Sequence, residues 1–403
     1  MDDSTTAATV TCADTRRFVG SFLLLVWLPI AVVVVLASIV VWRMSLTTSP
    51  AEIARKQHGN PALAWIGPAK LFTSIKVARL RLETPEIAII GASRLGEFRS
   101  AMFKPYGIYN GSFTGWTFSR LTTVLDMISA ARPPKVVLFN LDYLMFGSDW
   151  EQRWAANEAD WPLEYNCRTL ICARNGPDWN WWARELLDPG RKSGDEFTFF
   201  GLTASAQGGL SILHDGSLRY FPEIFDYKPE SGLPDVRNKR SVFDIVPKAT
   251  GTRMDPGQIE RLKVFAQAAQ RRGIRLVAVQ LPFPKAAVDV LDRGVDFDEN
   301  GKLRPGADMQ MWREFESAGT RAMLNDLGIL FADLTHLPEA ANAKAFVDPL
   351  HPGEYLTLAS TIEMLKDPQI RALLPEIDLA ALEEAKRQAE KDGNYFDIFK
   401  DRF

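Results

Sequence analysis

The chain has 403 residues, 46% of them hydrophobic, which is enough to bury the core of one large domain or two modest ones. Its formal net charge is -3, and charged residues make up 24% of the chain. These values exclude the basic surface of a nucleic-acid-binding protein and the composition of a disordered acidic one. We therefore expect no nucleic acid as a partner.

An uncharged apolar run extends from Phe18 to Trp42. As a helix it would measure about 37 Å, which exceeds the ~30 Å hydrocarbon core of a bilayer. A cleaved signal peptide would have an apolar region of about 7 to 15 residues, ending in small residues. The run therefore predicts a transmembrane anchor at 18–42 after an N-terminal tail at 1–17, with the bilayer as a partner.

The charges beside this run decide its orientation only weakly. Arg16 and Arg17 precede it, whereas Arg43, Arg55 and Lys56 follow it, so the positive-inside rule gives little preference. Short N-terminal tails usually stay in the cytoplasm. We therefore expect a single-pass protein of the inner membrane whose main domain is periplasmic or otherwise extracytoplasmic.

Cys167 and Cys172 form the only close cysteine pair of the exported part. A disulfide between them is geometrically and compartmentally consistent, and two free thiols are an equally good interpretation. No histidine accompanies the pair at metal-site spacing, so we expect neither a metal nor another cofactor.

The first part of the exported chain changes character near residue 83. Residues 43–82 resemble a stalk with some helix, because polar residues and a proline lead into an apolar pattern studded with Lys and Arg. Over 83–148 the pattern alternates: a buried strand at 87–90 ends at Gly91, a helix covers 118–131, and a strand covers 136–141.

Residues 149–250 do not alternate, and we interpret them as an aromatic-rich insertion or cap. Its aromatic rings could stack on sugars, although such rings more often fill a core or lie at a membrane interface. Six tryptophans lie in its first part: Trp150, Trp154, Trp161, Trp179, Trp181 and Trp182.

The alternation of strands and helices returns over 251–372. Asp255 and Pro256 form an N-cap and first turn, and Gly273 ends that helix. The elements expected next are a strand at 274–281, a helix at 308–327 ended by Gly328, a strand at 329–331 and a helix at 354–365. Residues 373–403 include an amphipathic helix at 379–391. This order predicts an α/β fold with a parallel sheet and helices on both faces.

Active sites of open α/β sheets form at the carboxyl ends of the strands. Gly91-Ala92-Ser93-Arg94 follows the first strand, so Ser93 is a candidate nucleophile near backbone N–H groups that could bind an oxyanion. A serine at such a junction is also a common N-cap, so the assignment requires a base.

Among the four histidines, His351 best meets this requirement. It lies before the last core helix, and Asp348 precedes it by three residues. An Asp there can accept the Nδ1 proton and leave Nε2 free to deprotonate Ser93. His336 is the second candidate base. His58 and His214 lie in the stalk and the insertion, where surface or core roles are expected.

The serine after the first strand and the Asp-x-x-His before the last helix resemble the SGNH, or GDSL-type, hydrolase superfamily over about 85–142 and 251–366. The resemblance implies a flavodoxin-like three-layer sandwich and maps the catalytic set onto Ser93, Asp348 and His351. It also maps a glycine of the oxyanion hole onto Gly111, in Asn110-Gly111-Ser112 after the second strand, to act with the Ser93 N–H.

One block departs from the pattern of the family. Where its members have Gly-x-Asn-Asp, this chain has Asn140-Leu141-Asp142-Tyr143, which puts Asp142 in place of an oxyanion-binding Asn. A carboxylate would repel an oxyanion, and loss of one donor costs about 3 kcal/mol. Asn140 could replace it, or the hole could use backbone donors alone.

The first block, Gly-Ala-Ser-Arg, is similar to divergent membrane-anchored members that assist D-alanylation of teichoic acids and O-acetylation of exopolysaccharides. These often act beside a multi-pass membrane acyltransferase. The resemblance implies a serine ester hydrolase or O-acyltransferase acting on an envelope or extracellular glycan. The alternative is a scaffold for polysaccharide assembly that kept the fold and lost the reaction.

Two other enzyme classes fit the motif less well. Gly91 to Gly96 lacks the middle glycine of a dinucleotide-binding Gly-x-Gly-x-x-Gly, and no acidic residue ends the second strand near Tyr109. Gly91 to Leu95 also lacks the closing glycine of an α/β-hydrolase nucleophile elbow.

Overall fold

A five-stranded parallel sheet forms the centre of the protein, in the order β3-β2-β4-β8-β9. Its strands are β2 (Ile87–Gly91), β3 (Ile108–Ser112), β4 (Val136–Asn140), β8 (Arg275–Gln280) and β9 (Ile329–Asp333). Counted within the sheet the order is 2-1-3-4-5, a doubly wound order whose ligand crevice lies where the winding reverses, between β2 and β4. The predicted parallel α/β sheet is confirmed.

The computed structural model describes residues 12–43, 48–60, 63–66, 71–128, 132–160, 162–164, 198–201, 210–220, 253–293, 310–347, 350–396 and 398–399. Several predictions fall outside these ranges. They concern the Cys167 and Cys172 pair, the proposed acid Asp348, and the tryptophans Trp161, Trp179, Trp181 and Trp182.

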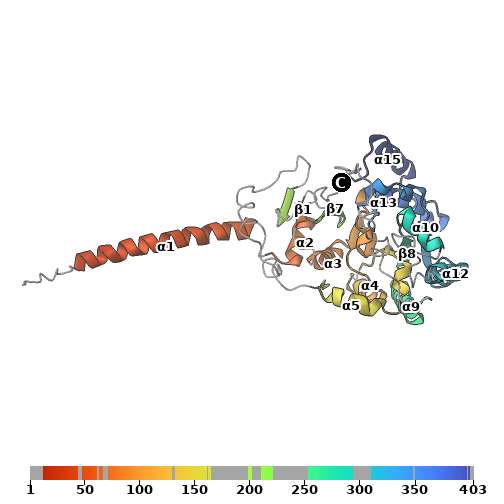
Figure 1. Cartoon of the computed structure of the whole chain (residues 1–403), viewed down its shortest axis with the longest axis horizontal. Coiled ribbons are helices and arrows are strands. Elements are labelled where there is room, and N and C mark those ends of the chain that lie inside the picture. The colour runs from red at the N-terminus through yellow and green to blue at the C-terminus, as the bar shows by residue number, and fades with distance from the viewer. Residues whose placement is uncertain are drawn as a thin grey trace, which may run out of the picture.

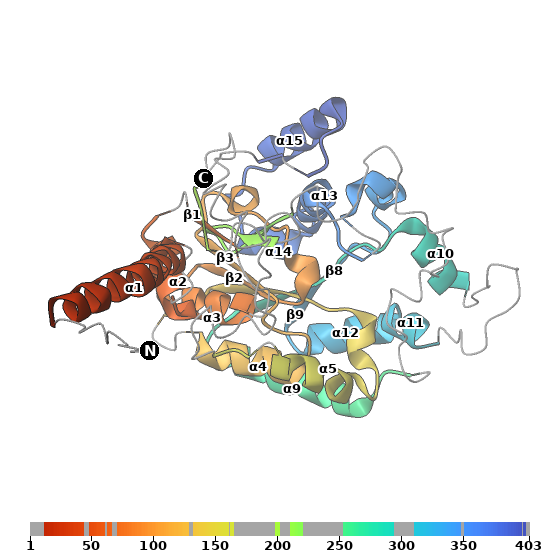
Figure 2. The ribbon, with the colours of Figure 1, turned by 60° about the vertical axis from the view of Figure 1, so that its left-hand side comes forward.

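Helices cover both faces of the sheet because its strands are apolar on both sides. Ile89 packs in one core with Leu358, whereas its neighbour Ile90 packs in the other with Leu262. The first face carries α13 (Glu354–Met364), α14 (Pro368–Leu373) and α15 (Leu379–Asp392). The second carries α4 (Phe118–Met127), α9 (Pro256–Gln270), α10 (Lys285–Arg293), α11 (Gln310–Phe315) and α12 (Ala318–Asp326). Figure 2 shows α4 and α9 below the strands and α13 and α15 above them.

Local capping explains where the helices begin. The Asp255 side chain accepts a hydrogen bond from the Gln258 N–H, and Pro256 occupies the first turn, as predicted. The single helix predicted at 308–327 is wrong, because α11 ends at Phe315 and Ser317 caps the next helix by accepting from the Thr320 N–H.

The predicted stalk at 43–82 is also wrong from Thr48 onward. Its elements are α2 (Pro50–His58), β1 (Leu63–Ile66) and α3 (Phe72–Glu83), and they pack into the domain. Trp65 and Leu80 are fully buried, and Leu80 belongs to the core of the main sheet. The Lys and Arg residues of α3 gave it a surface-like pattern, although two of them, Lys76 and Arg79, are buried.

A second sheet joins this segment to the insertion. It has the order β5-β1-β6-β7 and unites β1 with β5 (Thr198–Gly201), β6 (Leu210–Ile212) and β7 (Leu218–Tyr220). The insertion also contributes α5 (Trp150–Asp160). The second sheet is thus built from β1, which precedes β2 in the chain, and from β5, β6 and β7, which follow β4. It forms an added layer beside β3.

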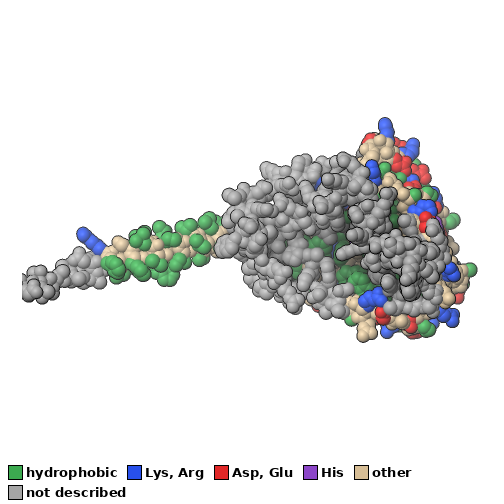
Figure 3. Space-filling model, in the orientation of Figure 1, with side chains coloured by type: hydrophobic (Ala, Val, Ile, Leu, Met, Phe, Trp, Pro, Cys, Tyr) green, Lys and Arg blue, Asp and Glu red, His purple; other side chains and the backbone are tan. Residues whose placement is uncertain are grey.

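The N-terminal helix α1 (Cys12–Arg43) extends away from the rest of the chain (Figure 1). An 18-residue window within its segment Arg16–Ile39 has a mean hydropathy of 2.9, and none of that window is buried. Figure 3 shows hydrophobic side chains along this helix. By length and composition, it is the one helix in the described part of the chain that could cross a membrane.

Candidate active site

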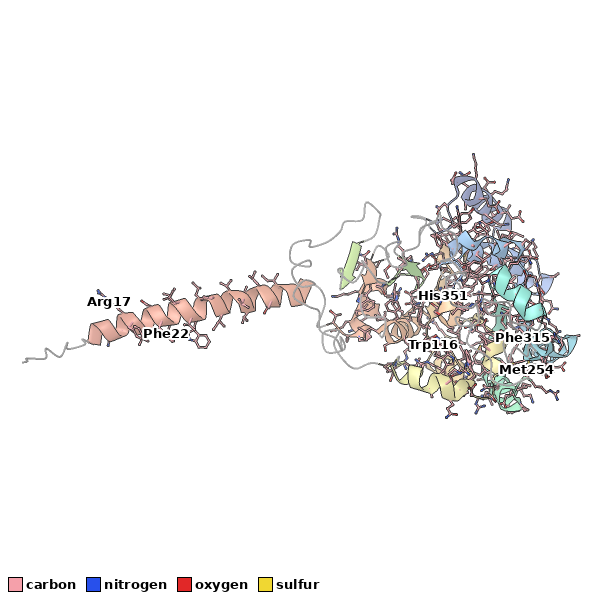
Figure 4. The ribbon with its side chains drawn as sticks, viewed as in Figure 1. Arg17, Phe22, Trp116, Met254, Phe315 and His351 are labelled. Carbon is pink, nitrogen blue, oxygen red and sulfur yellow. The ribbon has the colours of Figure 1, made fainter. Side chains whose placement is uncertain are left out.

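Ser93 and His351 face each other at the carboxyl end of the parallel sheet. The His351 Nε2 lies 2.7 Å from the Ser93 Oγ, although the two residues are 258 positions apart in the chain. Both side chains are partly exposed. Figure 4 shows His351 within the folded domain, far from Arg17 and Phe22 on α1. The distance is that required between a nucleophile and its base.

The turn that presents Ser93 requires glycine and an amide partner. Gly91 has a φ of +147°, and a Cβ there would lie 2.2 Å from the Asn140 Oδ1. The same Asn140 oxygen accepts a 2.7 Å hydrogen bond from the Ala92 N–H. The end of β4 therefore holds the backbone immediately before Ser93.

Asn110, fully buried in β3, holds the backbone after Ser93. Its Nδ2 donates to the carbonyls of Leu95 at 2.8 Å and Phe98 at 3.0 Å, and its Oδ1 accepts from the Ser112 N–H at 2.9 Å. In the sequence, Asn110 stands out only as a neighbour of Gly111. Its role depends on β3 lying beside β2, which no local pattern reveals.

Asp142 does not lie free at an oxyanion position. Its Oδ1 forms an ion pair with the Arg94 guanidinium, and its Oδ2 accepts a 3.0 Å hydrogen bond from the Asn140 Nδ2. All three side chains are buried. Arg94 balances the charge of Asp142, so the expected repulsion of an oxyanion by an unpaired carboxylate does not apply, and the oxyanion position of Asp142 stays a prediction. Asn140 directs its amide to Asp142 and Ala92, which leaves the predicted oxyanion role of Asn140 without support from its contacts.

Gln280 completes the group below the Ser93 turn. It is fully buried at the end of β8, and its amide, in the orientation that satisfies its neighbours, donates to the Leu141 carbonyl at 2.6 Å and to the Asp142 Oδ1 at 3.3 Å. Sequence reasoning missed Gln280, although a polar residue ending an apolar strand was a usable signal.

Gly111 belongs to strand β3 and does not follow it, so the predicted position of Asn110-Gly111-Ser112 is wrong. The Asn110 N–H points away from β2, to the Asp215 carbonyl at 2.7 Å. Because amides alternate in direction along a strand, the Gly111 N–H points into the β2 pairing and cannot receive an oxyanion. Glycine is needed there because a Cβ would lie 2.8 Å from Leu80 of α3.

Gly115 is the glycine that does follow β3. Its N–H donates to the Gly91 carbonyl at 3.2 Å, which places this amide beside the turn that carries Ser93. Phe113, two residues earlier, has a φ of 68°, an unusual value for a bulky residue, and the Thr73 hydroxyl holds its carbonyl at 2.7 Å.

The segment that carries His351 is closed on itself. The Val347 N–H donates to the His351 carbonyl at 2.9 Å, and the Gly353 N–H donates to the Ala345 carbonyl at 2.8 Å. Asp348 is outside the described residues, so its contact with the His351 ring stays a prediction.

The other histidines are not at this site. His336, the second candidate base, is exposed after β9. The His58 Nδ1 lies 2.9 Å from a Glu83 oxygen on the surface. His214 lies beside Arg79 in the added layer, where its backbone carbonyl accepts a 3.0 Å hydrogen bond. Burial lowers the pKa of His214 below its ordinary value, because the charged ring is poorly solvated there.

The described tryptophans of the insertion are mainly core residues. The buried Trp150 donates its indole N–H to the Trp116 carbonyl at 2.7 Å. Trp154 stacks on Trp116 with ring centroids 5.7 Å apart. These contacts favour the packing interpretation over sugar stacking for Trp150 and Trp154.

A cluster of buried charges lies beside β3, on the side away from β2. Arg99 binds Glu97 at 2.7 Å and Glu354 at 3.3 Å, and burial alone would lower the Arg99 pKa, but these carboxylates raise it above its ordinary value. Burial lowers the pKa of Lys76 well below its ordinary value, and its ammonium donates to the Ser112 hydroxyl at 2.7 Å. Sequence reasoning placed Lys76 in a stalk and so missed it.

The chain matches no protein-family model and no curated protein sequence. Within the described ranges, no group of three or more His, Cys, Asp or Glu residues is arranged to hold a metal ion. The case for function therefore rests on the geometry at Ser93 and His351.

Proposed function

We propose that this protein is a membrane-anchored serine enzyme that moves an acyl group from an ester to a glycan hydroxyl or to water. The observation that carries the proposal is the 2.7 Å separation of the Ser93 Oγ and the His351 Nε2 at the reversal point of a doubly wound sheet.

In the proposed reaction His351 takes the Ser93 proton while the serine oxygen attacks the ester carbonyl. The resulting oxyanion is bound by the Ser93 N–H; the Gly111 and Gly115 N–H groups are committed elsewhere, Gly115 to the Gly91 carbonyl. Collapse breaks the ester C–O bond, and His351 gives its proton to the leaving alcohol. An acceptor hydroxyl or water, deprotonated by His351, then attacks the acyl-serine and releases the free serine. Asp348 is assigned the role of orienting the His351 ring, and no step requires a cofactor.

The same features support the SGNH hydrolase assignment as part of the proposal. The serine follows the first strand of the sheet, the histidine directly precedes α13 on one face of the sheet, and the strand order is 2-1-3-4-5. The exposed apolar α1 supports an anchored location. We propose that the domain is extracytoplasmic, where an envelope or extracellular glycan is the substrate and a multi-pass membrane acyltransferase is the acyl source.

The test is labelling with a fluorophosphonate probe, which reacts with an activated serine. The wild-type protein is expected to label at Ser93, as mass spectrometry of the modified peptide would show, and Ser93→Ala should not label. Ser100→Ala is the matched control, because Ser100 lies outside the site and its loss should leave labelling intact. If the folded wild-type protein does not react with the probe, the proposed enzyme activity is wrong, and the alternative of an inactive scaffold is favoured.

A further inference from the structure

Arg94 follows the nucleophile directly, yet its side chain points away from the reaction. Its guanidinium is buried, with 4% of the side chain exposed. It forms an ion pair with Asp142 from the loop after β4. Its other nitrogens contact segments that are far away in the chain.

Those contacts reach the two remaining loops of the site. The NH2 nitrogen donates to the carbonyls of Leu281 at 2.8 Å and Pro282 at 2.9 Å, both after β8. The Nε donates to the carbonyl of Leu350 at 3.2 Å, one residue before His351. The guanidinium also lies 4.0 Å from the centre of the Phe283 ring. One side chain therefore joins the loops after β2, β4 and β8 to the histidine segment.

We propose that Arg94 is the positioning residue that sets the distance between Ser93 and His351. This inference rests on the proposed function, since it explains how the catalytic pair is held. The backbone of Arg94 is bonded to that of Ser93, and its Nε holds the residue bonded to His351, so a shift of either loop strains the same guanidinium. Asp142 serves this link by fixing the guanidinium plane.

The link requires arginine and not merely a positive charge. A guanidinium presents donors in a rigid planar fork and stacks on an aromatic ring, whereas a lysine ammonium is a single point on a flexible stem. Lysine at position 94 could keep the ion pair with Asp142, but it could not also reach the carbonyls of Leu281 and Leu350. Arg94→Lys should therefore keep the positive charge but lose the hydrogen bonds that link the loops.

The first experiment measures hydrolysis of a simple acetyl ester by the full chain in detergent. Arg94→Lys is expected to lower kcat roughly a hundredfold while KM changes less than about twofold, because a misplacement of about 1 Å costs that much in rate without weakening ground-state binding. Unchanged kcat in Arg94→Lys would overturn the proposal.

The matched control is Arg79→Lys. Arg79 is equally buried, forms an ion pair with Glu83 and donates to two backbone carbonyls, but it lies on α3 beside Tyr109 and not at the site. Its variant should keep kcat within about twofold of wild type. An equal loss of kcat in both variants would mean that the effect follows general destabilisation, and the proposal would fail.

A double variant is also needed, because replacing Arg94 alone could leave the Asp142 carboxylate buried without a partner and unfold the protein. The pair Arg94→Gln with Asp142→Asn removes both charges together, so the fold should be retained. Its kcat is still expected to fall roughly a hundredfold, because the link to Leu350 is absent. Wild-type kcat in this folded double variant would contradict the proposal.

Amide hydrogen exchange separates this inference from the proposed function, because it does not depend on turnover. In Arg94→Lys the peptide 350–356 should exchange at least about tenfold faster, while β8 exchanges as in wild type. If the wild-type protein is inert toward esters but this local change appears, the proposed function fails and the link stands. If exchange of 350–356 is unchanged, the link itself is wrong.

Discussion

The turn that carries Ser93 and the segment that carries His351 are held in different ways. The turn is held from within the sheet, by Asn110 and Asn140 on the two strands that flank β2. The His351 segment lies outside the strands of the main sheet. It is held by Arg94 and by the C-terminal residues, among which Phe396 packs against Gly353.

This difference indicates that the Ser93 turn is the more rigid part of the site. Strand pairing fixes the position of the Ser93 turn, so the turn should survive most changes elsewhere. The position of His351 depends on a few side chains and on C-terminal residues. Glu354 shows this dependence, since its carboxylate accepts from the Ile398 N–H at 3.0 Å and pairs with Arg99. Variants of the two regions should show whether the Ser93 turn and the His351 segment act together, and which of them is more easily displaced.

The largest effect is expected where the two regions meet. Ser93→Ala and His351→Ala should each lower turnover by about six orders of magnitude, and the double variant should lose no more than either, because the two side chains act in one proton transfer. Ester hydrolysis by the purified variants is the measurement. Additive losses would show that the two residues act separately and that the unit is not a catalytic pair.

Asp348→Asn should have the next largest effect. The carboxylate is expected to accept the Nδ1 proton of His351, and the amide would favour the wrong tautomer, which lowers the rate by up to about four orders of magnitude in serine protease triads. Rates should be compared with a thermal unfolding curve, which ought to stay unchanged. A variant with near-normal turnover would place the orienting group of the histidine segment elsewhere.

Asp142→Asn distinguishes the observed ion pair from the predicted oxyanion position. It leaves the Arg94 charge buried without its partner, so the free energy of unfolding should fall by about 3 to 5 kcal/mol, and ester turnover should fall with it. Denaturant titration and hydrolysis at low temperature would measure both. An oxyanion position would give the opposite result, since the amide would supply a donor and turnover would hold or rise.

Glu354→Gln should loosen the histidine segment alone. The variant keeps the size of the side chain but weakens its bonds to Arg99 and to the C-terminal segment, at a cost of about 1 to 3 kcal/mol. Hydrogen exchange near His351 should rise while exchange near Ser93 stays constant. Glu97→Gln is the control, because Glu97 binds the same Arg99 from the segment that follows the Ser93 turn. If exchange rose equally in the peptides that contain Ser93 and His351, the two regions would not differ in how they are held.

The smallest effect is expected at the far edge of the sheet, beyond both regions. Burial, with the nearby Asp333 carboxylate, raises the pKa of Glu316 to about 8, so the folded protein holds this proton where the unfolded chain has released it. Stability should therefore fall as pH rises from about 4.5 to about 8, and Glu316→Gln should flatten this slope. Melting temperatures across this range would show it, whereas the ratio of variant to wild-type turnover should not change with pH.

The sequence by itself determined the features whose causes are local. The apolar run of β2, the glycine turn before Ser93 and the Asp255 cap of α9 were predicted because a few neighbouring residues decide them. The long apolar helix near the N-terminus belongs to the same group, since length and composition alone define it. The pairing of Ser93 with His351 was predicted too, because the carboxyl ends of parallel strands share one edge.

Only the tertiary structure decided the features that join distant segments. The supposed stalk is part of the domain because β1 pairs with β5 of the insertion, and strand pairing between remote segments has no local signature. The charge of Asp142 is balanced by Arg94, and Gly111 turns its amide into the sheet because β3 lies beside β2. In each case the residue type was visible in the sequence. Its partner, which sets its charge balance or its direction, was brought to it by folding.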